Sequence, residues 1–298
     1  MSFVLGAGLV AGMAAHAHAD DGTLVDTLGP REIAVGEGLR GGATGASAIA
    51  LNPAGLALNK EVVFEGGYGY RSDDDASLVG VSACDSTAGI PGCFFYNYAA
   101  TNPDSTGMSL HTSTQLGGIA LAKAITPRFY VGAVGRYFHV DSDVPNMTSS
   151  GFNFDLGAEL RLTDFLSFGV SGQNLYGDSS PDLPRAAGGG LFIQPLPAVR
   201  LGFDMRWRLE GTQQGVRYGG GAELFIKSSS GQTGVPIRVG ALHDDGLDAT
   251  YVSGGLGIAT MKLDVDVGAR RAISGPADTV ILASMRLFGP RMPAPAME

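Results

Sequence analysis

The sequence predicts an all-β fold, a transmembrane antiparallel β-barrel of about 14 strands with an N-terminal periplasmic plug, or hatch. Apolar and polar residues alternate with a period of two along much of the chain, and the alternating stretches are mostly longer than the strands of a soluble sandwich. No stretch after residue 19 reaches the roughly 20 apolar residues that a transmembrane helix needs. With 44% hydrophobic and 16% charged residues, the chain of 298 residues is expected to fold.

The first residues are expected to be an export signal. The run from Phe3 to Ala15 is apolar and uncharged, and Ala17-His18-Ala19 has the small-x-small form of a signal-peptidase site, although no Lys or Arg precedes the run. Export would bring Cys84 and Cys93 into an oxidising compartment. We therefore predict one disulfide that closes the turn DSTAGIPG, with two free thiols as the alternative.

Strict alternation is clearest in VRLGFDMRWRL, which begins at Val199, and it recurs in FNFDLGAELRL and MKLDVDVGAR. The stretches that we expect to be strands are 61–70, 75–84, 93–100, 109–123, 128–140, 151–162, 164–174, 184–193, 198–209, 216–227, 236–244, 250–259, 261–271 and 279–288. Their even number suits a bacterial barrel.

The connections support the same arrangement. If the first strand starts in the periplasm, the connections after odd strands lie outside the cell and those after even strands lie in the periplasm. By these boundaries the odd connections are longer in total and carry most of the loop carboxylates. They include SDDD (72–75) and HDDGLD (243–248), which we expect to be solvated turns, and the longest is expected at 141–150.

The polar residues of the strands are expected to face the lumen. The predicted lumen charges are Arg136, Asp155, Glu159, Arg161, Arg200, Asp204, Arg206, Arg208, Asp264, Asp266 and Arg270, and the same alternation places Glu65, Arg217, Glu223, Arg238 and Arg286 there. Both signs are interspersed, and Arg can bind a carboxylate in two places. A polar passage is one interpretation. We favour the other, in which paired charges fill the lumen and hold the plug, because an unpaired dehydrated charge costs several kcal/mol.

The residues ahead of the first strand lack alternation. GGATGASAIALNPAGLAL (41–58) is uncharged, rich in Gly and Ala, and broken by Asn52-Pro53. Small side chains pack where space is limited, so we expect a plug in or under the barrel, shaped by Asn52, Pro53, Ala54 and Gly55. The predicted organisation is a signal peptide (1–19), a plug (20–60), a β-barrel (61–288) and a flexible C-terminal tail (289–298).

A resemblance to a known family rests on the same segment. The motifs Gly41-Gly42-Ala43, Ala46-Ser47-Ala48 and Asn52-Pro53-Ala54-Gly55-Leu56 resemble the N-terminal signature of the FadL-type fatty-acid transporters of the outer membrane and of the related PorV-like barrels of secretion machinery. SGQNL (171–175) and PLPAVRLG (195–202) resemble later strands of that family more weakly. The resemblance implies a barrel of fourteen strands with an N-terminal hatch. The long external loops that capture hydrophobic ligand in the fatty-acid transporters have no counterpart, which argues against fatty-acid uptake.

Other classes of function find little support. No Ser, His and Asp spacing suggests an esterase or protease, and the acidic turns lack the ligand pattern of a calcium loop. The net charge of −9 and the absence of a basic patch argue against nucleic acid. We expect no enzyme activity, no cofactor and no bound metal. The expected partners are outer-membrane lipid and lipopolysaccharide.

Two functions remain open for a barrel in the outer membrane of a Gram-negative cell. The first is passive transport of a small molecule, with a hydrophobic ligand as one class. The second is a non-conducting barrel that serves an envelope protein as partner or scaffold in secretion, motility or envelope assembly. A secreted soluble β-sandwich is the remaining alternative.

Overall fold

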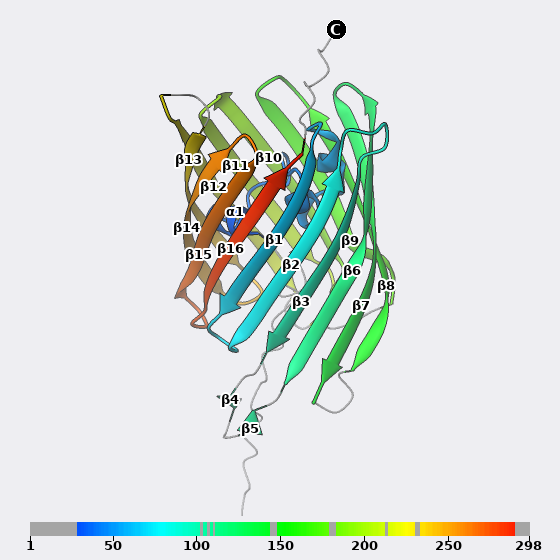
Figure 1. Cartoon of the computed structure of the whole chain (residues 1–298). Coiled ribbons are helices and arrows are strands. Elements are labelled where there is room, and N and C mark those ends of the chain that lie inside the picture. The colour runs from blue at the N-terminus through cyan, green and yellow to red at the C-terminus, as the bar shows by residue number, and fades with distance from the viewer. Residues whose placement is uncertain are drawn as a thin grey trace, which may run out of the picture.

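The computed structural model describes residues 29–101, 104–105, 108–109, 111–143, 148–178, 183–211, 214–229 and 233–289. The predicted signal peptide (1–19), the first part of the predicted plug (20–28) and residues 290–298 of the predicted tail lie outside these residues. The described residues form one closed barrel with N-terminal residues inside it (Figure 1).

Within the described residues, fourteen antiparallel strands form the barrel, as the sequence predicts. Each strand pairs with its neighbours in the chain, and the last pairs with the first from Val63↔Phe288 to Arg71↔Val280. The strands are β1 (Val62–Arg71), β2 (Ala76–Asp85), β3 (Gly92–Thr101), β6 (Thr112–Thr126), β7 (Phe129–Ser142), β8 (Ser149–Arg161), β9 (Leu166–Gly177), β10 (Ala186–Leu196), β11 (Val199–Arg208), β12 (Gly215–Lys227), β13 (Thr233–Asp244), β14 (Ala249–Thr260), β15 (Leu263–Ser274) and β16 (Thr279–Phe288). Between β3 and β6, β4 (Asp104–Ser105) and β5 (Met108–Ser109) form a separate hairpin.

Several strand ends differ from the predicted ones because residues of the connections continue the ladder. The predicted strand 109–123 is β6, at Thr112–Thr126. The predicted connection 141–150 is shorter at both ends, since β7 continues to Ser142 and β8 begins at Ser149. The connection that holds β4 and β5, between Thr101 and Thr112, is therefore longer than this one, contrary to the prediction. A strand length derived from membrane thickness does not limit strands that project beyond the membrane.

The alternation predicted from the sequence places apolar side chains outside and charged side chains inside. On β11, Phe203 is 49% exposed and Trp207 is 58% exposed, whereas Asp204 and Arg208 are buried. Neighbouring side chains of a strand point to opposite faces, so this pattern extends around a closed sheet. The outer surface is consequently the apolar one.

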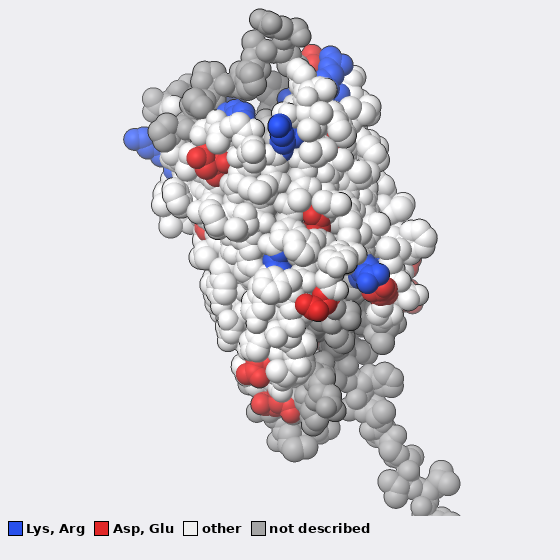
Figure 2. All heavy atoms as spheres, turned by 90° about the vertical axis from the view of Figure 1, so that its right-hand side faces the viewer, with Lys and Arg blue, Asp and Glu red and all other residues white. Residues whose placement is uncertain are grey.

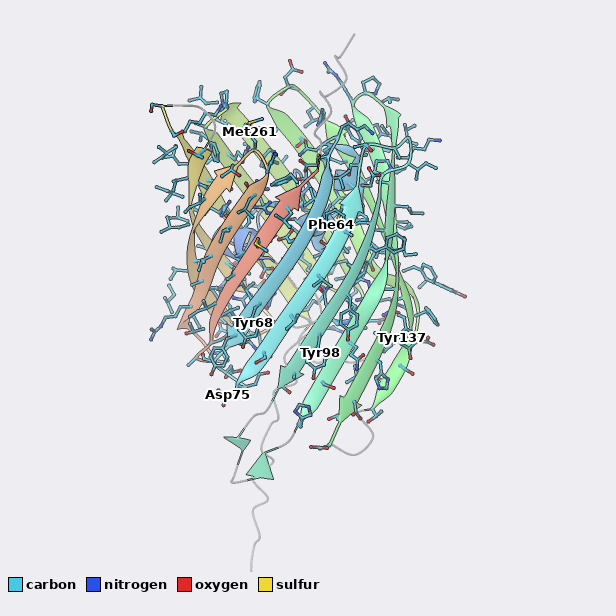
Figure 3. All side chains as sticks on the ribbon, in the orientation of Figure 1. Phe64, Tyr68, Asp75, Tyr98, Tyr137 and Met261 are labelled. Carbon is cyan, nitrogen blue, oxygen red and sulfur yellow. A yellow bond between two sulfur atoms is a disulfide. The ribbon has the colours of Figure 1, made fainter. Side chains whose placement is uncertain are left out.

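The two ends of the barrel carry the two kinds of connection. Asp75, between β1 and β2, and Met261, between β14 and β15, lie at opposite ends (Figure 3), which we call the Asp75 end and the Met261 end. Connections after odd strands of the barrel gather at the Asp75 end, and connections after even strands gather at the Met261 end. Most side chains on the face shown in Figure 2 are uncharged.

Residues 29–58, which we call the N-terminal segment, lie inside the barrel. They form helix α1 (Pro30–Ala34), helix α2 (Ala46–Leu51) and the 3-10 helix η1 (Pro53–Ala57). α1 contacts β13 to β16, η1 contacts β6 to β8, and α2 contacts β2 and β3. Proline opens α1 and η1, where its missing N–H costs no helical hydrogen bond. Among the described residues, no helix is both long and apolar enough to cross a membrane.

Glycines of the inner wall let the backbone of the N-terminal segment lie directly against the strands. A Cβ on Gly202 of β11 would lie 1.6 Å from the carbonyl oxygen of Gly38, and a Cβ on Gly268 of β15 would lie 2.2 Å from that of Pro30. Across the barrel, a Cβ on Gly132 of β7 would lie 2.4 Å from the carbonyl carbon of the first η1 residue. The segment is therefore in backbone contact with both sides of the barrel.

The interior has an apolar half and a charged half. Buried apolar side chains of β3, β6 and β7, among them Phe95, Leu116 and Phe138, form one cluster with apolar residues of α2 and η1. The buried side chains of β11 to β16 include many Arg, Asp and Glu residues. The N-terminal segment lies between these halves.

Cys84 of β2 and Cys93 of β3 lie directly opposite each other and form a disulfide. No cysteine of the chain is free. The bond closes the connection between these strands at the Met261 end.

Candidate functional site in the barrel lumen

A first network of ion pairs in the lumen surrounds Glu223 of β12. Glu223 accepts hydrogen bonds from Arg238 of β13 (2.6 Å) and from Arg31 of α1 (3.1 Å), and it also pairs with Arg200 of β11. Arg238 donates a further hydrogen bond to Asp266 of β15 (2.6 Å). The sequence places four of these five charges in the lumen by alternation, and the structure adds Arg31, which ties α1 to the wall.

The same network continues onto the strands that close the barrel. Arg286 of β16 pairs with Asp266 and lies 3.9 Å from Asp264. Glu65 of β1 is the cross-strand partner of Arg286. The charged half of the lumen thus extends from β11 to β1.

A second network lies nearer the Asp75 end. Asp244 of β13 accepts hydrogen bonds from Arg208 (2.6 Å) and Arg217 (2.8 Å). Glu37 of the N-terminal segment pairs with Arg217 (3.5 Å) and with Arg270 of β15 (2.9 Å). Opposite charges that share several partners offset part of the cost of removing each from water. Both networks therefore anchor the N-terminal segment as well as the strands.

One carboxylate that the sequence places in a solvated turn is instead buried, and carboxylates of two other connections are paired with Arg. Asp244, in the stretch HDDGLD, is fully buried, and Asp278 is buried and paired with Arg270 (3.4 Å). Asp74, in the stretch SDDD, is half-buried and accepts a hydrogen bond from the Nε of Arg71 (2.9 Å). The expectation of a solvated turn is wrong for Asp244. Asp244 is the last residue of the predicted strand 236–244 and of β13, and alternation within that strand directs its side chain into the lumen.

Arg40 connects the N-terminal segment to two strands. Its backbone N–H donates to both carboxylate oxygens of Asp204 (3.1 and 2.9 Å). Its guanidinium group donates to the carbonyl oxygen of Leu51 (2.5 Å) and to the hydroxyl of Ser171 on β9 (2.5 Å). Arg40 thus joins the first part of the segment, the end of α2 and the barrel wall.

The stretch SGQNL on β9 forms an irregular part of the wall. Asn174 has a positive φ of 53°, and the register between β8 and β9 shifts beside it. Its N–H donates to Asp155 (2.7 Å), which is itself paired with Arg136. Gln173, the neighbouring residue, donates from its amide to the carbonyl oxygen of Ala50 (2.6 Å). A bulge re-aims side chains, and here two successive side chains point inward.

The motif Asn52-Pro53-Ala54-Gly55 lies at the corner between α2 and η1. The Asn52 amide donates to the carbonyl oxygens of Arg40 and of Ala158 on β8 (both 3.1 Å), and its oxygen accepts from the N–H of Ala54 (3.3 Å). A Cβ on Gly55 would lie 2.0 Å from a carbonyl oxygen of the preceding loop. Asn52 therefore caps η1 and fixes the segment to the wall in one side chain.

An apolar cavity of about 110 Å³ separates the N-terminal segment from β1, β2, β3 and β16. The apolar side chains at its surface include Ile33, Ile49, Leu78, Phe95, Val280 and Leu282. Glu32 and Glu65 also line it. On this side of the barrel, contact between the segment and the wall is thin, because α2 makes few contacts with β2 and β3.

A second, polar cavity of about 300 Å³ lies at the Met261 end, beside the connection between β8 and β9. Glu159, Arg161 and Arg200 line it. Arg161 donates to the carbonyl oxygen of Leu58 (3.3 Å) and lies over the ring of Tyr130, 5.3 Å from the centroid. Glu159 is buried, and its carboxylate oxygens accept no hydrogen bond from the described residues.

The structure brings most of the predicted lumen charges into these groups, and Arg206 is buried beside them on β11. Sequence reasoning missed the charges of the N-terminal segment, namely Arg31, Glu32, Glu37 and Arg40. One feature of the sequence could have indicated their place in the lumen: they are the only charged residues of PREIAVGEGLRGG, a stretch otherwise made of small and apolar residues. Among the residues that the structure describes, no group of three or more His, Cys, Asp or Glu could hold a metal ion.

The barrel with its inner segment resembles several solved structures. A CymD monoaromatic hydrocarbon channel matches with a TM-score of 0.65 and 11% identity, over 88% of this chain and 97% of that chain. The Ralstonia pickettii toluene transporter TbuX matches with a TM-score of 0.65 and 12% identity, over 89% of this chain and 98% of that chain. The Pseudomonas putida toluene transporter TodX matches with a TM-score of 0.66 and 11% identity, over 88% and 97%.

The chain has the FadL-type fold. The fold implied by the resemblance of residues 41–56 is thus confirmed. Identities of 11% and 12% carry the likeness no further than the fold. No protein-family model matches the sequence, and a search of the curated proteins finds no match.

Proposed function

We propose that this chain is an outer-membrane β-barrel that lets a small hydrophobic molecule cross the membrane passively. An apolar outer surface around an interior that holds the charged side chains of the strands suits a barrel in lipid. The FadL-type fold includes structures described as toluene transporters. The observation that carries the proposal is the apolar cavity of about 110 Å³ between the N-terminal segment and the barrel wall.

We propose that residues 20–60, which include the N-terminal segment, form a plug inside a barrel made by residues 61–288. Its support is the combination of buried ion pairs and backbone contact on two sides. Arg31 and Glu37 pair with strands of the charged half, and Asn52 donates to β8 on the other side. A plug held in this way leaves space for a passing molecule on the β1, β2 and β16 side.

We propose a route along the barrel axis. The pairing of β1 with β2, of β2 with β3 and of β1 with β16 carries no register shift, so the wall beside the apolar cavity is a regular ladder. The molecule enters at the Asp75 end, outside the cell, and leaves at the Met261 end, in the periplasm. The carboxylates at the Asp75 end suit bridging through divalent cations to lipopolysaccharide, and the outer surface contacts lipid.

The test is flux through purified barrels in liposomes. Vesicles that hold the full mature chain should take up benzyl alcohol faster than empty vesicles. Deletion of residues 20–58 should raise single-channel conductance several-fold, because it removes the segment that fills the lumen. Deletion of residues 290–298 is the matched control and should leave conductance unchanged.

Uptake equal to that of empty vesicles would contradict transport and favour the alternative, a non-conducting partner or scaffold for an envelope protein. Unchanged conductance after deletion of residues 20–58 would contradict the plug.

A further inference from the structure

The apolar cavity carries more uncompensated negative than positive charge. Two carboxylates, Glu32 and Glu65, and two guanidinium groups, Arg71 and Arg270, line it. Arg71 is paired with a carboxylate of the β1–β2 connection (2.9 Å), and Arg270 is paired with Glu37 (2.9 Å). No ion pair within 4 Å joins Glu32 or Glu65 to a described residue, although Arg286 attracts Glu65 across the β1–β16 pairing. The two guanidinium groups that line the cavity are thus paired from outside it, whereas Glu32 has no paired cation among the described residues and Glu65 shares Arg286 with Asp266.

The surroundings of the two carboxylates leave room for a cation. Glu32 is 2% exposed, and its Oε1 accepts a hydrogen bond from the hydroxyl of Ser47, whereas its Oε2 accepts none from the described residues. Glu65 lies opposite Arg286, which attracts it but is shared with Asp266, so Glu65 has no cation of its own. Glu32 and Glu65 are close enough to repel each other. Two like charges in a poorly hydrated site are stabilised by an opposite charge between them.

We propose that this cavity binds a compact amphiphilic cation, a protonated amine attached to one small ring or a short branched chain. The ammonium group lies between Glu32 and Glu65 and donates to the free oxygen of Glu32. The apolar body contacts Leu78, Phe95 and Leu282. The inference rests on the proposed transport function, because it names the class of molecule that this route admits.

Size and charge together exclude other ligands. An apolar cavity of roughly 150 Å³ holds one benzene. The cavity of about 110 Å³ therefore accepts at most one small ring and does not accept a long acyl chain. A carboxylate ligand would place a third negative charge beside Glu32 and Glu65. A neutral ligand of the same shape would gain the apolar contacts alone.

Binding is measured by calorimetry on the full mature barrel in detergent at pH 7, with benzylamine, benzyl alcohol and benzoate as probes of one shape and three charges. Benzylamine should bind at least tenfold more tightly than benzyl alcohol, and benzoate should bind most weakly. Glu65→Gln should lower the affinity for benzylamine at least tenfold and leave the affinity for benzyl alcohol unchanged. Glu210→Gln, at a side chain 47% exposed in a connection, is the matched control and should change neither.

Equal affinities of the unmodified chain for the three probes, or no binding of benzylamine, would overturn the inference. This comparison needs no variant, so the inference stays testable if the Glu65 variant fails to fold. Glu32→Gln is the second variant, with the same expected loss. The uptake of benzyl alcohol by liposomes reports on transport separately. Benzyl alcohol uptake without a preference for benzylamine would refute the charge selection and leave the proposed function standing.

Discussion

Gly202→Ala should release the N-terminal segment from the wall while the barrel stays folded. The added Cβ would lie 1.6 Å from the carbonyl oxygen of Gly38 and 2.8 Å from its carbonyl carbon. Non-bonded carbon atoms rest at roughly 3.5–4.0 Å from their neighbours, so the segment must retreat by about 1.5–2 Å. Overpacking of this kind costs about 1–3 kcal/mol.

The retreat also weakens a neighbouring contact. Asp204 lies two residues after Gly202 on β11, and Arg40 lies two residues after Gly38 in the segment. The two carboxylate oxygens of Asp204 accept hydrogen bonds from the backbone N–H of Arg40, at 3.1 and 2.9 Å. Hydrogen bonds to charged groups contribute about 1.5–3 kcal/mol each. A combined cost of about 3 kcal/mol raises the undocked fraction roughly 100-fold, since 1.4 kcal/mol corresponds to a factor of ten.

Trypsin cleavage after Arg31 or Arg40 reports the undocked fraction, because both lie inside the barrel when the segment is docked. Cleavage should be about 100-fold faster in Gly202→Ala than in the unmodified chain. Gly66→Ala is the matched control, since its Cβ would meet no atom within 4 Å. Heat-dependent migration on a gel verifies that both variants keep the barrel. Cleavage of Gly202→Ala at the rate of Gly66→Ala would refute the reasoning.

Three further changes test other parts of the structure. Asp244→Asn leaves two buried guanidinium groups without their shared carboxylate and should lower the free energy of unfolding in urea by about 3–5 kcal/mol, against less than about 1 kcal/mol for exposed Glu210→Gln; equal losses would contradict a buried network. Asn52→Ala removes the cap of η1 and two contacts with carbonyl oxygens, and trypsin should cleave after the segment's Arg residues roughly tenfold faster, a loss of more than about 1 kcal/mol; unchanged cleavage would contradict its anchoring role. Replacing both Cys84 and Cys93 by Ser removes a cross-link that spans a sequence separation of 9 and should cost up to about 2.5 kcal/mol in the same urea titration, and reduction of the unmodified chain should give the same loss.

The barrel was predictable because its signal is local. Alternation within one strand decides which side chains face outward, and Phe203 and Trp207 follow it without any knowledge of the neighbouring strands. Strand ends were less predictable, because Ser142 and Ser149 are typical of turns and yet continue the ladder. The ladder depends on the partner strand, which single-strand patterns do not describe.

The sequence predicted which charged side chains of the strands face the lumen, but not which of them pair with each other. Alternation directs Glu223 and Arg238 inward, but their pairing depends on the register between β12 and β13. Arg31 reaches Glu223 only because α1 lies against that wall, and nothing within PREIA specifies which strands it contacts. The apolar cavity is the space between the N-terminal segment and strands that are far from it in the chain. No single stretch of sequence therefore predicts it.

The anchoring of the N-terminal segment also bears on how the molecule is made. Arg31 meets a partner 192 residues away, and Glu37 meets one 233 residues away. Closing loops of that length costs entropy before any contact is gained, so these contacts form late. A chain that stops before β15 lacks the partner of Glu37 on that strand and the strand that closes the barrel against β1, so only part of the anchoring surface is present. Complete anchoring of the segment and closure of the barrel therefore depend on the same C-terminal strands, and a truncated chain is expected to leave its N-terminal segment more open to envelope proteases.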